Sequence, residues 1–144
     1  MTTPFIPGQD YVGSKVNAAP QVFTQQVTTQ QGIRAGGYQP KVAALAAAGS
    51  LAAISAQVGY DQAGSFVLTA GTTPTGGSIA TVTFGQPLSA APSSVNVTCG
   101  DQTNAATTSL VVGAVSVTKS GFTVYSGTAA TLNHAYLISY QVFR

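Results

Sequence analysis

The chain has 144 residues and a mass of 14.4 kDa, enough for one domain and an additional short segment. Only 6% of the residues are charged, the formal net charge is +2, and there are three acidic residues, one histidine and one cysteine. These numbers argue against a basic surface for nucleic acids, a metal cage, an internal disulfide and a full set of catalytic groups. We therefore expect a protein that is not an enzyme and carries no metal or cofactor.

The sequence shows no membrane or secretion signal. It has no apolar run of about 18 residues, and the N-terminal MTTPFIPGQD lacks a basic stretch followed by an apolar one. We therefore expect synthesis in a cytoplasm and no membrane partner. Surfaces with few charges tend to associate, which favours an oligomer over a monomer.

Residues 1–40 are expected to form an extended arm. Proline and glycine interrupt them every few residues, and the longest uninterrupted piece is the possible strand at residues 22–28. Such a segment buries too little apolar surface to order by itself, so we expect it to order on a partner. The apolar residues expected to dock are Phe5, Ile6, Tyr11, Val22, Phe23 and Val27.

Residues 41–64 are rich in alanine and are expected to connect the arm to the rest of the chain. Leu51, Ile54 and Val58 share one face of a helix, which favours a short helix over residues 51–58. An extended segment lying along a sheet is the alternative, because so short a helix is marginal without packing.

Residues 65–144 contain six short apolar or alternating runs separated by turn residues. Polar segments join the runs, except that a compact turn at Lys119–Gly121 joins the fourth run to the fifth and predicts a hairpin. The expected strands are Ser65–Ala70, Ser78–Phe84, Val95–Cys99, Leu110–Thr118, Phe122–Ser126 and Ala135–Phe143. The pattern predicts an all-β fold, a small antiparallel, jelly-roll-like β-sandwich of about six strands.

The last run is apolar on both faces, so both faces are expected to be covered. One cover would be the opposing sheet, and the other a neighbouring subunit or the connector. The residues that we take as a candidate oligomer interface are Tyr136, Ile138, Tyr140 and Val142.

Four segments together resemble a β-module found in tailed-bacteriophage virion proteins. They are GSFVLTAG at 64–71, GGSIATVTFGQPLSAAPSSVNVT at 76–98, VTKSGFTVYSGTAA at 117–130 and AYLISYQVF at 135–143. The module occurs in head fibres, capsid decoration proteins and tail-fibre tips, and H-type lectin-like domains are similar. The resemblance covers somewhat over half of the chain.

This resemblance implies a structural virion protein, often a homotrimer, on the outer surface of the capsid. The arm would dock on the major capsid protein and the β-domain would project outward. A chain of this length suits a capsid decoration or head-fibre protein. The alternative is an adhesin, a tail-tip or lectin-like module whose loops bind host-surface glycans or proteins.

Candidate chemistry is sparse in this sequence. His134 and Asp101 would supply two members of a Ser–His–Asp triad, but nothing in their spacing supports one, and a histidine at the end of a loop is the favoured interpretation. Cys99 shares a strand face with Val95 and Val97, so we expect a buried, unreactive thiol.

The polar loops are the better candidates for binding, because recognition commonly resides on loops held by a rigid scaffold. TTPTGG at 72–77 and GDQTNAATT at 100–108 are long and contain one charge between them. The candidate ligand residues are Thr72, Thr73, Thr75, Asp101, Gln102 and Asn104.

Overall fold

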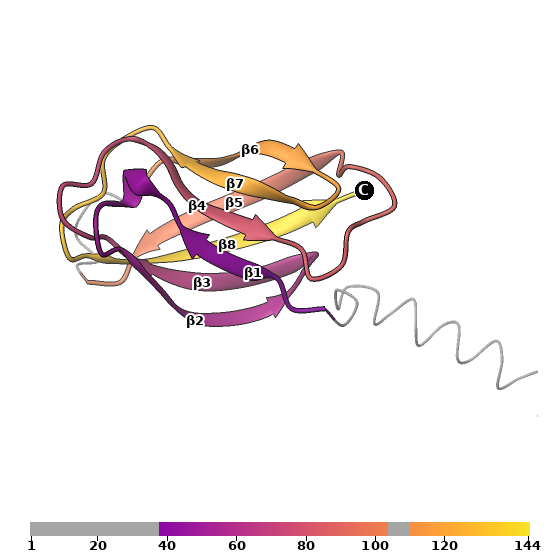
Figure 1. Ribbon diagram of the computed structural model, residues 1–144, viewed down its shortest axis with the longest axis horizontal. Helices are drawn as coiled ribbons and strands as arrows, with labels where there is room; N and C mark the ends of the chain where they lie inside the picture. The colour runs from indigo at the N-terminus through magenta and orange to yellow at the C-terminus, as the bar shows by residue number, and fades with distance from the viewer. Residues whose placement is uncertain (1–37, 104–109) are drawn as a thin grey trace, which may run out of the picture. The chain divides into compact units, whose positions relative to one another are not determined.

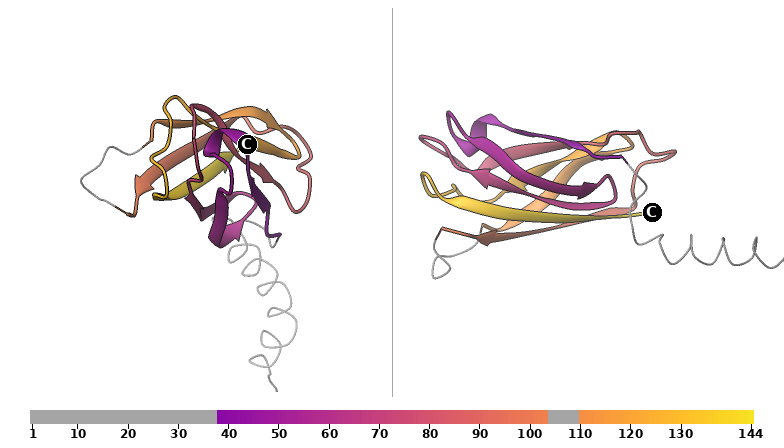
Figure 2. Two further views of the ribbon diagram at one scale, coloured as in Figure 1. Left: turned by 60° about the vertical axis from the view of Figure 1, so that its left-hand side comes forward. Right: turned by 90° about the horizontal axis from the view of Figure 1, so that it is seen from below.

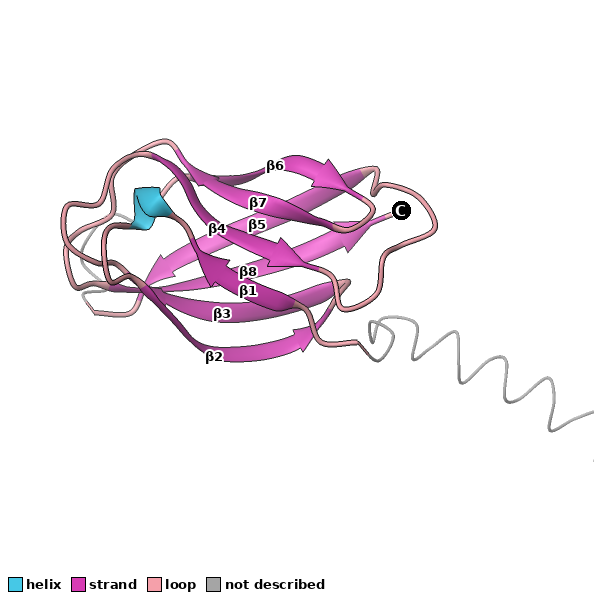
Figure 3. Ribbon diagram, viewed as in Figure 1, coloured by secondary structure: helices cyan, strands magenta, loops and turns pink. Residues whose placement is uncertain are grey.

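A computed structural model of the chain describes residues 38–103 and 110–144. The described residues form eight strands and one turn of 3-10 helix (Figure 3). In chain order the elements are β1 (Lys41–Ala44), η3 (Ala46–Ala48), β2 (Ala53–Tyr60), β3 (Ala63–Thr69), β4 (Gly77–Thr83), β5 (Ser94–Asp101), β6 (Val112–Thr118), β7 (Gly121–Ser126) and β8 (Ala135–Phe143).

The strands make two antiparallel sheets of four, in the orders β1-β4-β7-β6 and β2-β3-β8-β5. The sheets stack as two layers, with β1, β4, β7 and β6 in front in Figure 1 and the other sheet behind (Figures 1 and 2). The chain passes between sheets at most connections, and only β2–β3 and β6–β7 are hairpins between neighbouring strands. The expected all-β sandwich is confirmed.

The core lies between the two sheets and follows from the alternation of side chains along each strand. In β8, for example, Tyr136, Ile138 and Tyr140 are buried, whereas Leu137 and Gln141 are exposed. The largest fully buried side chains are Tyr136, Phe66, Leu68, Ile79, Ile138, Val82 and Val124.

The six strands expected after residue 64 are all present, with ends displaced by at most two residues. Gly121 has a φ of 147° at the β6–β7 turn, as the hairpin prediction requires. Val97 is buried, and Val95 and Cys99 pack against the core beside it. Pro74, Pro87 and Pro92 all lie between strands, where no ladder hydrogen bond is lost.

The helix expected over residues 51–58 is not formed, because β2 occupies these positions and pairs with β3 from Ala53 to Tyr60. Ile54 packs against the core, but Leu51 is 92% exposed with a φ of 68°, so the predicted helical face does not exist. Sheet pairing outweighs the high helix propensity of alanine, because intrinsic propensity is a weak determinant of structure beside tertiary packing. The connector is therefore part of the sandwich, and β1 adds a further strand to the other sheet.

The strand register shows at which end of the sandwich each connecting segment lies. Thr69 lies opposite Ala135 and Asp101 lies opposite Tyr136, so β3 and β5 end where β8 begins. We call this the loop end: it comprises described residues 45–52, 70–76, 102–103 and 127–134. The hairpin end comprises residues 38–40, 61–62, 84–93, 119–120 and 144, on the side of the C-terminus in Figure 1.

Candidate functional site

Two of the loops expected to bind a ligand lie at the loop end. Thr72, Thr73 and Thr75 lie on the β3–β4 loop, and Asp101 and Gln102 lie at the end of β5. Both segments are held to the start of β8, since the Ala70 N–H donates to the His134 carbonyl (2.9 Å) and the Gln102 N–H to the Ala135 carbonyl (2.7 Å). Asn104 lies outside the described residues.

The backbone of the β3–β4 loop is fixed, and the Thr72 and Thr73 hydroxyls donate to the Ser50 carbonyl (3.4 Å) and the Thr72 carbonyl (2.7 Å). Thr72 and Ser50 exchange two backbone hydrogen bonds of 2.8 and 3.0 Å, and the Thr75 N–H donates to the Ala47 carbonyl at 2.9 Å. Thr72, Thr73 and Thr75 are exposed. Because the backbone is already held by η3 and the following segment, this loop presents exposed threonines on a preformed frame.

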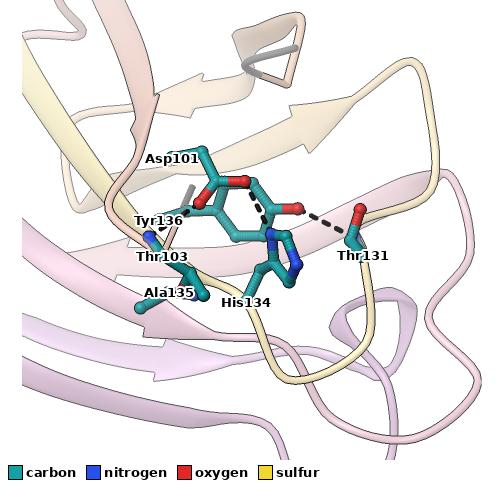
Figure 4. A network of polar contacts seen from close by, with 6 residues as sticks. All are labelled: Asp101, Thr103, Thr131, His134, Ala135 and Tyr136. Carbon is teal, nitrogen blue, oxygen red and sulfur yellow. Dashed lines mark hydrogen bonds and ion pairs between the residues drawn. The ribbon is translucent and has the colours of Figure 1, made fainter. Parts of the chain in front are cut away.

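Asp101 and His134 form a pair at the loop end, as Figure 4 shows. The His134 Nδ1 lies 2.7 Å from the Asp101 Oδ2, and the exposed fractions of the two side chains are 18% and 1%. The Thr103 N–H donates to the other carboxylate oxygen at 2.8 Å. The sequence places these residues 33 positions apart, and only the antiparallel pairing of β5 with β8 brings them together.

Neighbouring hydrogen bonds tie this pair to the loop that precedes β8 (Figure 4). The Ala135 N–H donates to the Thr103 hydroxyl at 2.7 Å, and the Thr131 N–H donates to the Tyr136 hydroxyl at 2.8 Å. The buried Tyr136 ring anchors the second bond to the core. The network therefore holds the β5 end and the β7–β8 loop in one arrangement.

The loop end lacks a third catalytic member in the part of the chain that the structure describes. No hydroxyl there is hydrogen-bonded to His134, whose partner is the Asp101 carboxylate. No group of three or more potential metal ligands occurs within residues 38–103 and 110–144 either. Beside the Asp101–His134 pair, the described residues of this end include exposed threonines and Gln102.

Cys99 is not activated as a nucleophile. Burial raises the pKa of its thiol, and the Asp101 charge raises it further, although a hydrogen bond with the Leu110 backbone acts in the opposite direction. A thiol with a raised pKa carries little thiolate at neutral pH, as expected for a side chain packed against the core.

The hairpin end is organised by Asp61, which the sequence did not single out. The buried Asp61 carboxylate accepts hydrogen bonds from the Gly85 N–H (2.7 Å) and the Gln86 N–H (3.1 Å), and the Asp61 N–H donates to the Tyr38 carbonyl (3.0 Å). One aspartate at a hairpin turn thus holds the start of the described chain and the β4–β5 loop. The only sequence signal is an acidic residue at a turn, which many exposed turns also carry.

Tyr140 completes the buried polar groups beside this turn. Its hydroxyl donates to the Tyr60 carbonyl at 2.8 Å, and its ring contacts Phe122 edge-on with centroids 5.4 Å apart. Burial, and secondarily the charge of Asp61, raise the pKa of the Tyr140 hydroxyl.

The candidate oligomer interface is corrected by the structure. Tyr136, Ile138 and Tyr140 are buried between the sheets, and Val142 packs against the same core, so these side chains are not available at the surface of the sandwich. The sequence shows the alternation of side chains in β8, but it does not show which of the two faces is directed into the core. The outer face carries Leu137 and Phe143, which are 36% and 47% exposed.

The docking residues expected in the arm lie outside the described residues: Phe5, Ile6, Tyr11, Val22, Phe23 and Val27. The described part of the chain contains no helix whose length and hydropathy would suffice to span a bilayer. Comparison with protein-family models, with curated proteins and with solved structures finds no match to this chain.

Proposed function

We propose that this chain is a structural virion protein of a tailed bacteriophage, a capsid decoration or head-fibre protein. The arm at residues 1–40 docks on the major capsid protein, and the sandwich projects its loop end outward. The proposal starts from the resemblance of residues 64–143 to the virion β-module and from the charge-poor composition.

The observation that best supports this function is the separation of the two ends of the sandwich. The described chain begins at Tyr38, which Asp61 holds at the hairpin end, whereas Thr72, Thr73, Thr75 and Gln102 of the two candidate ligand loops lie at the loop end. A chain tethered through the residues before Tyr38 would thus leave its loops accessible. Burial of apolar arm residues on a shell would stabilise the shell by mass action.

The test measures how many copies of this protein bind to purified phage particles. Full-length protein is added to particles that lack it, and bound copies are measured by quantitative mass spectrometry against the major shell protein. We expect hundreds of copies in simple ratio to the shell for the wild type. The double variant Phe5→Ser/Phe23→Ser should bind at least about tenfold more weakly, since each buried Phe contributes about 1.5–3 kcal/mol.

The matched control is Leu132→Ser, which removes an exposed apolar side chain from the loop end. It should bind particles like the wild type. Absence of the chain from purified particles, or undiminished binding of the arm variant, would contradict the proposed function.

A second candidate, the adhesin, is favoured by one observation: Thr72, Thr73 and Thr75 are exposed on a backbone that is already fixed. The double variant Thr72→Ala/Thr75→Ala separates the two functions. Loss of binding to host cells with intact particle binding would favour the adhesin. Unchanged cell binding, or no cell binding by the wild type, would contradict it.

A further inference from the structure

The two sheets expose four edge strands, and three of them carry features that prevent pairing with another chain. β1 has four residues and an exposed Lys41. β2 shifts register between Ser55 and Val58, where Ala56 has a φ of 47°, and β6 shifts between Val115 and Thr118, where Ser116 has a φ of 51°. Short length, lysine and bulges are the usual protections of an edge strand.

β5 is the edge strand without these protections among residues 38–103 and 110–144. It pairs with β8 in one uninterrupted register from Ser94 to Asp101, and it contains no proline and no charge before Asp101. Valine and threonine, which favour extended structure, alternate through its centre. An edge of this length and composition is a template for strand addition.

The register identifies which backbone groups face away from β8. The Gln102 N–H donates to the Ala135 carbonyl opposite it, and in an antiparallel pair such bonds recur at every second residue. The backbone groups of Val95, Val97 and Cys99 therefore point away from β8. The pairing with β8 leaves these three residues without a backbone partner in β8.

We propose that β5 pairs antiparallel with β5 of a second copy of this chain, joining two four-stranded sheets across a two-fold axis. A second copy is the partner whose edge presents the same row of donors and acceptors, and an isologous contact closes by itself and covers both edges. This inference does not depend on the proposed function.

The side chains of β5 are compatible with antiparallel pairing to β5 of a second copy. With the axis at Val97, Asn96 lies opposite Thr98 of the second copy, and Val95 lies opposite Cys99 of the second copy. Inward-facing side chains then meet inward-facing ones, and Asn96 and Thr98, both exposed, meet on the outer face. No like charges oppose each other, since Asp101 falls opposite Ser93 of the second copy.

The nearest outward-facing neighbours of Asn96 and Thr98 are also uncharged. They include Ser139 and Gln141 on β8 and Ser65 on β3, and a hollow of about 280 Å³ lies over Asn96, Thr98, Ser139 and Gln141. Two such surfaces can approach with little electrostatic repulsion, consistent with a net charge of only +2.

The test compares two double variants of the full-length chain. In Asn96→Lys/Thr98→Asp, the two-fold register places lysine opposite aspartate twice. In Asn96→Lys/Thr98→Lys, it places lysine opposite lysine twice. Both pairs of side chains are exposed in the single chain, so circular dichroism should show the same fold for both. Oligomeric mass is measured by sedimentation equilibrium over a concentration series.

We expect the wild type and the lysine–aspartate variant to reach twice the 14.4 kDa chain mass. The lysine–lysine variant should dimerise about tenfold more weakly or remain monomeric. The charge-matched control is Ala53→Lys/Ser55→Lys, which adds two exposed lysines to β2 at the other edge of the same sheet and should dimerise like the wild type.

Three results would overturn the proposal. A monomeric wild type would show that β5 does not pair with a second copy, so that any partner of this edge would be a strand of a different protein. A trimer, which the virion resemblance implies, would exclude a two-fold contact as the source of assembly. Equal dimerisation of the two β5 variants would show that Asn96 and Thr98 do not face each other across the interface.

Discussion

Gly71 lies where the β3–β4 loop runs against the segment after η3. A Cβ atom at this position would be 1.9 Å from the Ser50 carbonyl oxygen and 2.6 Å from the Ala52 backbone nitrogen. Both contacts are with hydrogen-bonded backbone, since Ser50 is paired with Thr72 and the Ala52 N–H donates to the Gly49 carbonyl at 3.2 Å. Glycine is therefore required at this position by a close backbone approach.

We expect Gly71→Ala to lower the free energy of unfolding by about 1–3 kcal/mol, because the backbone must move to admit the methyl group. Gly113→Ala is the matched control: nothing lies within 4 Å of a Cβ there, and the residue lies in β6. It should be neutral or stabilise by up to about 1 kcal/mol. Urea unfolding measures both, and equal midpoints for the two variants would refute this explanation.

At the scale of elements, Asp101 and His134 join the end of β5 to the residue before β8. The carboxylate is almost completely buried and also accepts the Thr103 N–H, so the interaction is more than an exposed ion pair. Its removal should loosen the loop end without changing the sheets.

A double-mutant cycle measures this coupling. Asp101→Asn and His134→Gln should each destabilise the fold, and their effects should be non-additive by about 0.5–3 kcal/mol. A control cycle pairs His134→Gln with Asp61→Asn at the hairpin end, where additivity within about 0.5 kcal/mol is expected. Chemical denaturation supplies all values, and an additive first cycle would show that the 2.7 Å contact contributes no coupling.

The elements themselves could be predicted to different extents. β3 to β8 were found from alternation and turn residues, because in each the local pattern agrees with its final environment. β2 was missed because Leu51, Ile54 and Val58 satisfy a helical spacing by coincidence, while pairing with β3 decides the conformation. β1 was missed because four residues of an alanine-rich segment carry no recognisable period.

The candidate site could be predicted only in part. Loops are recognisable in the sequence, but the residues that contact them in the fold are not. Thr72, Thr73 and Thr75 were expected on a loop and are exposed on one. The His134–Asp101 contact had no support from spacing, and Asp61 had no distinguishing signal. The first contact depends on the register of β5 with β8, and the second on the approach of turns from two different sheets. They join residues 33 and 24 positions apart.

At the scale of the molecule, the contribution of the N-terminal part of the arm to stability can be tested by truncation. The described residues belong to a compact unit that starts at Ala35, and every described core residue lies between Ala48 and Tyr140. Deleting residues 1–34 retains Tyr38 and its hydrogen bond from Asp61.

We expect this truncation to change the free energy of unfolding by no more than about 0.5 kcal/mol, since no described core contact is removed. Guanidinium unfolding of the truncated and full-length chains should give the same midpoint and the same denaturant dependence. A lower midpoint would show that residues 1–34 contribute to the stability of the sandwich.

The sequence by itself determined the fold class, six of the eight strands and the placement of prolines and polar loops, because each of these follows from local alternation and turn chemistry. Tertiary structure alone decided which face of β8 is buried, the strand identity of residues 53–60, the Asp101–His134 contact and the unprotected edge of β5. These four depend on which strands become neighbours and in what register. Such pairings join residues distant in sequence, and no local pattern encodes them.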